Sequence, residues 1–341
     1  MSSFKKGNRM AEYNGIMTYC EITEGELPSI SKEVLGCGRM LADDLGQELC
    51  AVLVGSDAGS LAQEAITFGA DKVYVVDDPL LKEYQTDSYL AVMEKVIRQV
   101  MPQILILGQT SVGRDLAPML AFRLDTTAIL DCVSLAIDPD TKLLLQTKPV
   151  YGGNAQATFT CDSFPQIATV RDKAMAPLES NASKKGEVIT IDAGLDPSAI
   201  RTRLLKRVKE DEGGVRLEEA PVIVSGGRGI GSVEGFNQLQ ELAEMLKGAV
   251  GASRPPCDNG WAAPNRQVGI TGRIVSPDLY IAIALSGSIQ HLSGCGQAKS
   301  IIAINKDPKA HIFNQADFGV VGDWKKVLPA FRDKLKELLS E

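Results

Sequence analysis

Short apolar runs alternate with segments of helical length along most of this 341-residue chain, and this alternation limits the possible folds more than any other feature. The runs at 50–55, 72–76 and 104–107 have the length of buried strands, and residues 60–68 and 88–100 separate them. Strands that alternate with helices in this way predict βαβ units and a parallel sheet. The chain is therefore expected to fold as an α/β protein.

Two α/β domains are expected, because a chain of this length fits two domains of about 100 to 200 residues each. Residues 143–170 are β-rich, and Tyr151-Gly152-Gly153-Asn154 suits a tight connection, which predicts hairpins added to the edge of the first sheet. Charged, glycine-containing sequence places the linker near residues 200–216. We predict an N-terminal α/β domain with added hairpins over 1–205 and a C-terminal α/β domain with a doubly wound parallel sheet over 206–341.

The composition excludes several kinds of partner. The net charge is −7 and the charges are interspersed, so the chain lacks the basic stripe that would bind nucleic acid. No run reaches the roughly 18 to 20 apolar residues of a membrane span, and the amino terminus has no apolar signal segment, so we expect a cytoplasmic protein. The seven cysteines form no Cys-x-x-Cys pair and there are only two histidines, so no metal site is expected.

In the second domain, five polar or glycine-rich breaks each follow an apolar run that reads as a buried strand. Because the carboxyl ends of parallel strands form one edge of a sheet, groups that follow successive strands converge on one crevice. Taken singly, each break has an ordinary explanation as a turn or a helix cap, but their shared edge predicts a ligand site. The breaks are Ser225 to Arg228, Ser253-Arg254, Ser286 to His291, Asn305 to Pro308, and Gly322 to Trp324.

Side chains in and near these breaks suit a flat, anionic ligand. Gly226-Gly227 would let the backbone approach a ligand closely, and Arg228 could donate to a pyrophosphate or a carboxylate, although a glycine turn with a surface arginine is the alternative. Arg254 follows such an apolar strand that we expect it in a partly desolvated place. The glycines of Gly269 to Gly272 flank the hydroxyl of Thr271, which suits close passage of the backbone past a flat ring.

A further junction, in the first domain, places small hydroxyl residues ahead of a helix. The backbone N–H groups there, with Thr110 and Ser111, could hold an anion, but most such junctions are simple N-caps.

With these motifs in order, the chain resembles the α subunits of electron transfer flavoproteins, the family that includes the FixB-type proteins. The resemblance covers nearly the whole chain. Its motifs in the second domain are Val224 to Gly229, Val250 to Arg254, Gln267 to Gly269, Tyr280 to Ala282, Ser286-Gly287 with Ile289 to Leu292, and Ala303 to Pro308. Its motifs in the first domain are Ser111 to Pro118, Tyr151 to Asn154 and Ala168 to Arg171.

The resemblance implies one FAD in the C-terminal domain and a role in electron transfer. In the family, the arginine at the position of Arg254 lies beside the isoalloxazine, the hydroxyl at Thr271 bonds near N5, and the imidazole at His291 lies near the C2 carbonyl. The cofactor-binding residues that it implies are Arg228, Ser253, Arg254, Gln267, Val268, Gly269, Ile270, Thr271, Gly272, Ser286, Gly287, Ser288, Ile289, Gln290, His291, Asn305, Asp323 and Trp324.

Positive charge and hydrogen-bond donors near the ring would stabilise the negative charge that reduction places there. Arg254 and His291 are the expected charge stabilisers, whereas Asn305 and Asp323 are expected at the nucleotide end. Ile270 departs from the family, in which a glutamine often precedes the threonine, and its aliphatic side chain removes one polar contact near the ring.

The resemblance also implies a heterodimer with a β subunit that exchanges electrons with a flavin dehydrogenase such as an acyl-CoA dehydrogenase. Electron bifurcation stays open; in that case the β subunit carries another FAD and oxidises NADH, and ferredoxin or flavodoxin is a partner. A different class, a nucleotide-binding hydrolase or ligase of the adenine nucleotide α hydrolase-like group, is the alternative. The lack of a glycine-rich phosphate loop after the first strand counts against it. We assign no catalytic residue.

Overall fold

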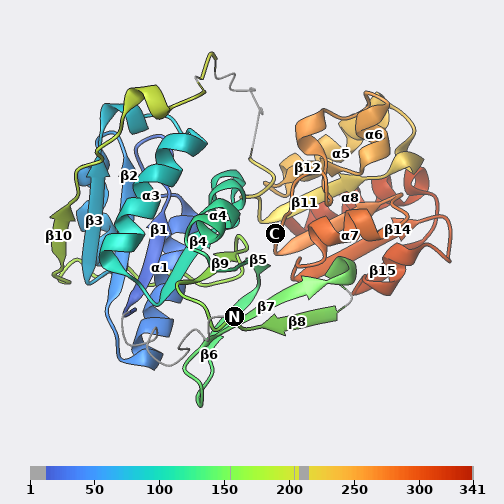
Figure 1. Cartoon of the computed structure of the whole chain (residues 1–341). Coiled ribbons are helices and arrows are strands. Elements are labelled where there is room, and N and C mark those ends of the chain that lie inside the picture. The colour runs from blue at the N-terminus through green and yellow to red at the C-terminus, as the bar shows by residue number, and fades with distance from the viewer. Residues whose placement is uncertain (1–12, 154, 203, 207–214, 340–341) are drawn as a thin grey trace, which may run out of the picture. The chain divides into compact units, whose positions relative to one another are not determined.

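The computed structural model describes residues 13–153, 155–202, 204–206 and 215–339, which form two compact units (Figure 1). The first unit comprises residues 1–150 and 156–207, and the second comprises 151–155 and 208–341. Within the predicted linker, residues 207–214 lie outside the described residues. Each unit is considered by itself.

The first unit is built on a seven-stranded sheet in the order β10-β3-β2-β1-β4-β9-β5, and every neighbouring pair of strands is parallel. This arrangement confirms the predicted α/β fold. The strands are β1 (Ile16–Cys20), β2 (Leu49–Gly55), β3 (Lys72–Asp77), β4 (Ile104–Gly108), β5 (Ala128–Cys132), β9 (Gln166–Val170) and β10 (Glu187–Thr190).

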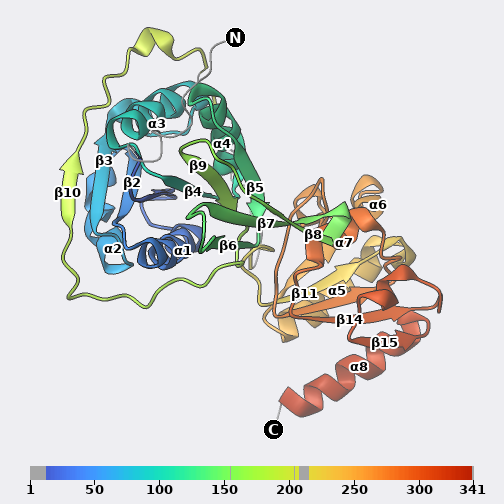
Figure 2. The same cartoon turned by 60° about the horizontal axis from the view of Figure 1, so that its bottom comes forward.

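Helices cover both faces of this sheet (Figure 2). On one face lie α1 (Ser29–Leu45), the 3₁₀ turn Ala58–Leu61 and α2 (Ala62–Thr67); on the other lie α3 (Thr86–Val100) and α4 (Ser111–Arg123).

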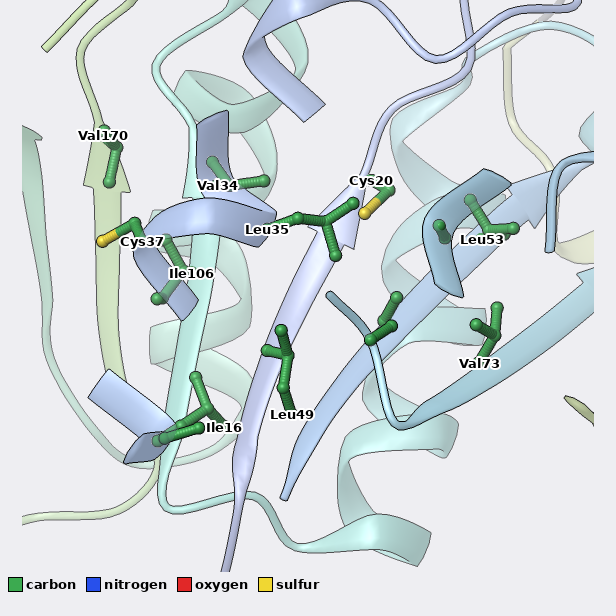
Figure 3. Close-up of a cluster of buried hydrophobic side chains, with 14 of the residues drawn as sticks. Ile16, Cys20, Val34, Leu35, Cys37, Leu49, Leu53, Val73, Ile106 and Val170 are labelled. Atoms are coloured by element: carbon green, nitrogen blue, oxygen red, sulfur yellow. The ribbon is translucent and has the colours of Figure 1, made fainter. Parts of the chain in front are cut away.

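Figure 3 shows Val34 and Leu35 of α1 in the first of the two resulting cores, with Ile16, Leu49 and Leu53 from the sheet. Because successive strand residues point to opposite faces, Ile16 enters this core and Met17 enters the other. Each fully buried aliphatic side chain of this kind contributes about 1.5–3 kcal/mol.

The predicted placement of the β-rich segment is wrong in two respects. β9, expected within an edge hairpin, lies inside the large sheet and pairs in parallel with β4 and β5. All five of its residues are buried, as a strand covered on both faces requires. The remaining strands β6 (Ser134–Ile137), β7 (Leu144–Val150) and β8 (Ala155–Phe159) form a separate three-stranded sheet in which β6 and β7 are antiparallel.

The second unit contains a five-stranded sheet in the order β12-β11-β13-β14-β15, again with parallel neighbours. β11 lies between β12 and β13. The chain adds β12 on one side of β11 and then adds β13, β14 and β15 on the other side, so the strand order reverses between β11 and β13. The strands are β11 (Val222–Gly226), β12 (Ala249–Ala252), β13 (Leu279–Ile283), β14 (Ser300–Asn305) and β15 (Phe318–Val321).

Helices also lie on both faces of the second sheet, as a doubly wound fold requires. α5 (Val233–Met245) and α8 (Trp324–Leu339) pack on one face, and α7 (Ile289–Cys295) lies on the other with the 3₁₀ turn His311–Asn314. The short α6 (Arg254–Asp258) follows β12 directly. None of the helices in the described part of the chain is long and apolar enough to cross a membrane.

Candidate functional site

The five predicted breaks all lie at the carboxyl edge of the second sheet. The register fixes this placement, because Gly226 pairs with both Ala252 and Ile283, and Asn305 pairs with Val321. The loops that follow these residues therefore start from neighbouring strand ends. In open α/β sheets, ligands bind at this edge where the strand order reverses, here between β11 and β13.

The glycines of these loops are needed for packing within the protein. A Cβ atom on Gly227 would lie 2.1 Å from the carbonyl oxygen of Ala284, and one on Gly287 would lie 2.2 Å from the backbone nitrogen of Ile312. No side chain fits at such distances from a backbone atom. The chain's own backbone thus fills the space in which a Cβ on these glycines would lie, so both positions require glycine.

The loop 267–273 is fixed between β12 and α7. The Val268 N–H donates to the carbonyl oxygen of Ala252 at 2.8 Å, and the Ile270 N–H donates to that of Gln290 at 2.9 Å. The side-chain amide of Gln267 donates to the hydroxyl oxygen of Thr271 at 3.0 Å. The Thr271 oxygen thus accepts a hydrogen bond, and its own proton remains available to an acceptor on a ligand.

Arg254 is exposed, and not partly desolvated as predicted. It opens the short helix α6, from which its side chain is 67% exposed, and its Nε donates to Asp258 Oδ2 at 3.2 Å. An exposed ion pair of this kind contributes less than about 1 kcal/mol. The guanidinium can therefore exchange Asp258 for an anionic ligand at low cost.

His291 is buried, with only 4% of its surface exposed, and both ring nitrogens bind protein groups. Nδ1 lies 3.0 Å from the carbonyl oxygen of Val268, which can only accept, so Nδ1 carries the proton. Nε2 then accepts from the hydroxyl of Tyr280 at 2.9 Å. Burial lowers the pKa of His291 from 6.5 to about 4. The imidazole is therefore neutral at pH 7 and adds no positive charge to the sheet edge.

Three other predicted residues hold the edge together. The Asn305 side chain donates to the carbonyl oxygen of Leu285 at 2.7 Å and accepts from the Asp307 N–H at 2.9 Å. Asp323 accepts from the Lys325 N–H at 3.0 Å and so caps the start of α8. The indole of Trp324 is buried in the core, and its N–H donates to the carbonyl oxygen of Gly229 at 3.0 Å.

The remaining predicted residues lie around the same edge. Ser253 lies between β12 and α6 and is half-buried. Arg228, Ser286, Ser288, Ile289 and Gln290 are exposed. Ile270 is 55% exposed, so an aliphatic side chain faces solvent beside Thr271.

Comparison with known proteins accounts for this arrangement. A family profile described as "Electron transfer flavoprotein domain" matches residues 16–196, and one described as "Electron transfer flavoprotein FAD-binding domain" matches residues 216–296. The electron transfer flavoprotein subunit alpha of Thermoanaerobacterium thermosaccharolyticum is 46% identical over 96% of this chain and 100% of its own length. The chain belongs to the family of electron transfer flavoprotein α subunits.

Two further relatives have similar coverage. The electron transfer flavoprotein subunit alpha of Megasphaera elsdenii is 44% identical over 96% of this chain and 98% of its own length. The acryloyl-CoA reductase electron transfer subunit beta of Anaerotignum propionicum is 38% identical over 95% of this chain and 96% of its own length. Membership of the flavoprotein family replaces the alternative of a nucleotide hydrolase or ligase.

As an electron transfer flavoprotein α subunit, the chain binds FAD in its second unit, where the FAD-binding profile matches. The exposed groups at the sheet edge fit that cofactor: Arg228 and Arg254 are suited to phosphate or to negative charge on the ring, and the Thr271 hydroxyl can donate to a ring nitrogen. Tyr280, whose hydroxyl binds the His291 ring, is not among the predicted site residues. A tyrosine within an otherwise apolar strand was the sequence signal that could have indicated it.

At the start of α4, where an anion site was considered, the groups of the protein bind one another. The hydroxyl oxygen of Thr110 accepts from the Gly113 N–H at 3.0 Å, and the hydroxyl donates to the carboxylate of Glu21. Glu21 thus lies where a bound anion would have to be. The N-cap explanation of Thr110 and Ser111 holds, and the structure does not favour an anion site there.

Proposed function

We propose that this chain is the α subunit of a heterodimer with an electron transfer flavoprotein β subunit, and that it exchanges electrons with a flavin-containing acyl-CoA dehydrogenase or reductase. Near full-length similarity to α subunits supports the heterodimer. Similarity to the electron transfer subunit of an acryloyl-CoA reductase supports an acyl-CoA enzyme as the electron partner. We further propose that the protein works in the cytoplasm.

We propose that the eighteen predicted positions surround the FAD, with divided tasks. The exposed side chains of Arg228, Arg254, Thr271 and Gln290 would contact it directly. The buried side chains of His291, Asn305 and Trp324 would keep the loops in place, because each already binds a backbone group.

FAD, when bound, supplies the capacity to take up and release electrons. Arg254 would bind next to the ring and favour negative charge on it. A charge-assisted hydrogen bond of about 2 kcal/mol corresponds to about 90 mV in a one-electron potential. Thr271 would donate its free hydroxyl proton to the ring, whereas Ile270 offers only an aliphatic contact.

Flavin stoichiometry in the co-expressed heterodimer tests the proposal. One FAD per heterodimer, reduced through an acyl-CoA dehydrogenase and not directly by NADH, is the result expected of a conventional carrier. Two FAD per heterodimer with direct anaerobic reduction by NADH would instead identify the bifurcating form. A folded heterodimer without flavin would refute the proposed site.

A further inference from the structure

A cavity of about 340 Å³ opens at the carboxyl edge of the first sheet, where β1 and β2 end. All of its lining residues belong to the first unit. β2 lies on one side of β1, and β4, which comes later in the chain, lies on the other side. The strand order of the first sheet therefore reverses at β1. Ligands of open α/β sheets bind at such points, and pockets of this size accept small molecules.

The hydroxyl of Tyr19 is a candidate contact for a ligand in this cavity. Its side chain lines the cavity and is only 3% exposed, yet its hydroxyl forms no hydrogen bond with any described residue. Two neighbouring tyrosines differ in this respect, since Tyr84 donates to Asp115 at 2.6 Å and Tyr89 donates to the Leu81 carbonyl oxygen at 2.8 Å. Because Tyr19 lines the cavity, its hydroxyl oxygen can accept a hydrogen bond from a molecule bound there.

Glu21 supplies a carboxyl group to the same cavity. Among the described residues it accepts from the Thr110 hydroxyl and pairs with no lysine, arginine or histidine. Burial raises the pKa of Glu21 to about 7.

Other titratable groups line the cavity with Glu21. The other charged or titratable residues of the lining are Tyr19, Glu24, Lys82, Glu83, Tyr84 and Tyr89, and Asp115 lies behind Tyr84. Three glutamates and one lysine line the cavity, and Glu21 shares it with Tyr19 and has no cationic partner among the described residues.

The start of α4 is closed to an anion by Glu21 itself, so phosphate chemistry is disfavoured here. We propose that this cavity binds a small organic cation, an ammonium or a guanidinium, that pairs with the carboxylate of Glu21 and donates a second hydrogen bond to the hydroxyl oxygen of Tyr19. A guanidinium would bind the carboxylate through two parallel hydrogen bonds. The tyrosine rings of the lining favour a cation as well. The residues of this site all belong to the first unit, whereas the FAD-binding profile matches the second.

Calorimetric titration of the FAD-loaded full chain with n-butylguanidinium and with n-butylammonium tests the proposal and separates the two cation types. Both probes stay protonated between pH 6 and pH 8, whereas the ionised fraction of Glu21 rises from about one tenth to about nine tenths around its raised pKa. Binding of at least one cation should therefore be about tenfold tighter at pH 8 than at pH 6. Neutral 1-butanol and anionic AMP should bind more weakly.

Variants test whether the cation binds at Glu21 and Tyr19. Glu21→Gln should weaken binding and remove its pH dependence, and Tyr19→Phe should weaken binding about two- to tenfold. Glu187→Gln, an exposed acid at the opposite edge of the same sheet, should change neither. The proposal is overturned if neither cation binds at pH 8, if AMP binds more tightly, or if binding does not depend on pH. The wild-type pH dependence decides the matter even if Glu21→Gln fails to fold.

Discussion

Acid should destabilise the second unit through His291. The imidazole donates to the Val268 carbonyl oxygen and accepts from the Tyr280 hydroxyl, and it is buried in its neutral form. Replacement by glutamine keeps a side-chain donor and an acceptor but removes the titrating group. The stability of the wild type relative to His291→Gln should therefore depend on pH.

The magnitude follows from the lowered pKa of His291. The unfolded chain binds a proton near pH 6.5, whereas the folded chain does so only near pH 4, so stability falls as the pH drops below 6.5. Between pH 7.5 and pH 5 the wild type should lose about 2 kcal/mol relative to His291→Gln. Burial raises the pKa values of Glu21 and Glu33 to about 7, which acts in the opposite direction, but both groups are present in both proteins and cancel.

Tryptophan fluorescence can isolate the unit concerned. The chain has two tryptophans, Trp261 and Trp324, and both belong to the second unit. Urea unfolding followed by their emission, at several pH values between 7.5 and 5, gives the difference in unfolding free energy between the two proteins. A difference that stays constant over this range would refute the neutral, doubly bonded state of His291.

Three further changes should have measurable effects. Gly227→Ala would place a Cβ 2.1 Å from the Ala284 oxygen and should cost at least about 2 kcal/mol in tryptophan-detected unfolding, with loss of flavin. Asp131→Ala would leave the buried Arg171 without its two hydrogen bonds and should cost the first unit about 3 kcal/mol by circular dichroism. Thr110→Val should cost the first unit about 1 kcal/mol through the lost cap of α4.

Each of these changes has a control. Gly59→Ala should be harmless, because the nearest atoms to its Cβ lie 3.9 Å away. Asp131→Ala should leave the tryptophan-detected transition in place, and Thr110→Ser should restore the cap. Stability equal to the wild type in Gly227→Ala or Asp131→Ala would contradict the contacts described.

The strands of the second sheet could be predicted because each is a continuous apolar run. The apolar run at 318–321 predicts β15 to the residue. The apolar period over 233–247 predicts α5, which ends two residues earlier. The edge strand β10 was missed, because its residues are mostly exposed and lie in a charged segment that reads as a loop. The place of β9 was misjudged because pairing with β4 depends on contacts about sixty residues apart.

The location of the site could be predicted from the sequence, but the charge and exposure of its individual side chains could not. Parallel pairing alone brings the five breaks to one edge, which the sequence indicates. The charge of His291 depends instead on Tyr280 and on Val268, which come from a strand and a loop that local sequence does not join to it. The exposure of Arg254 depends likewise on the direction in which α6 leaves the sheet.

The position of β9 has a consequence for synthesis of the chain. β5 emerges from the ribosome before β9, yet among the described strands it pairs only with β9. The other side of β9 pairs with β4. A nascent chain that stops before residue 166 would therefore carry an unpaired β5 and an open edge on β4, the kind of surface that recruits other chains. The first sheet closes on this side only once residues 166–170 have been made, so the intervening three-stranded sheet is synthesised while the fold is incomplete.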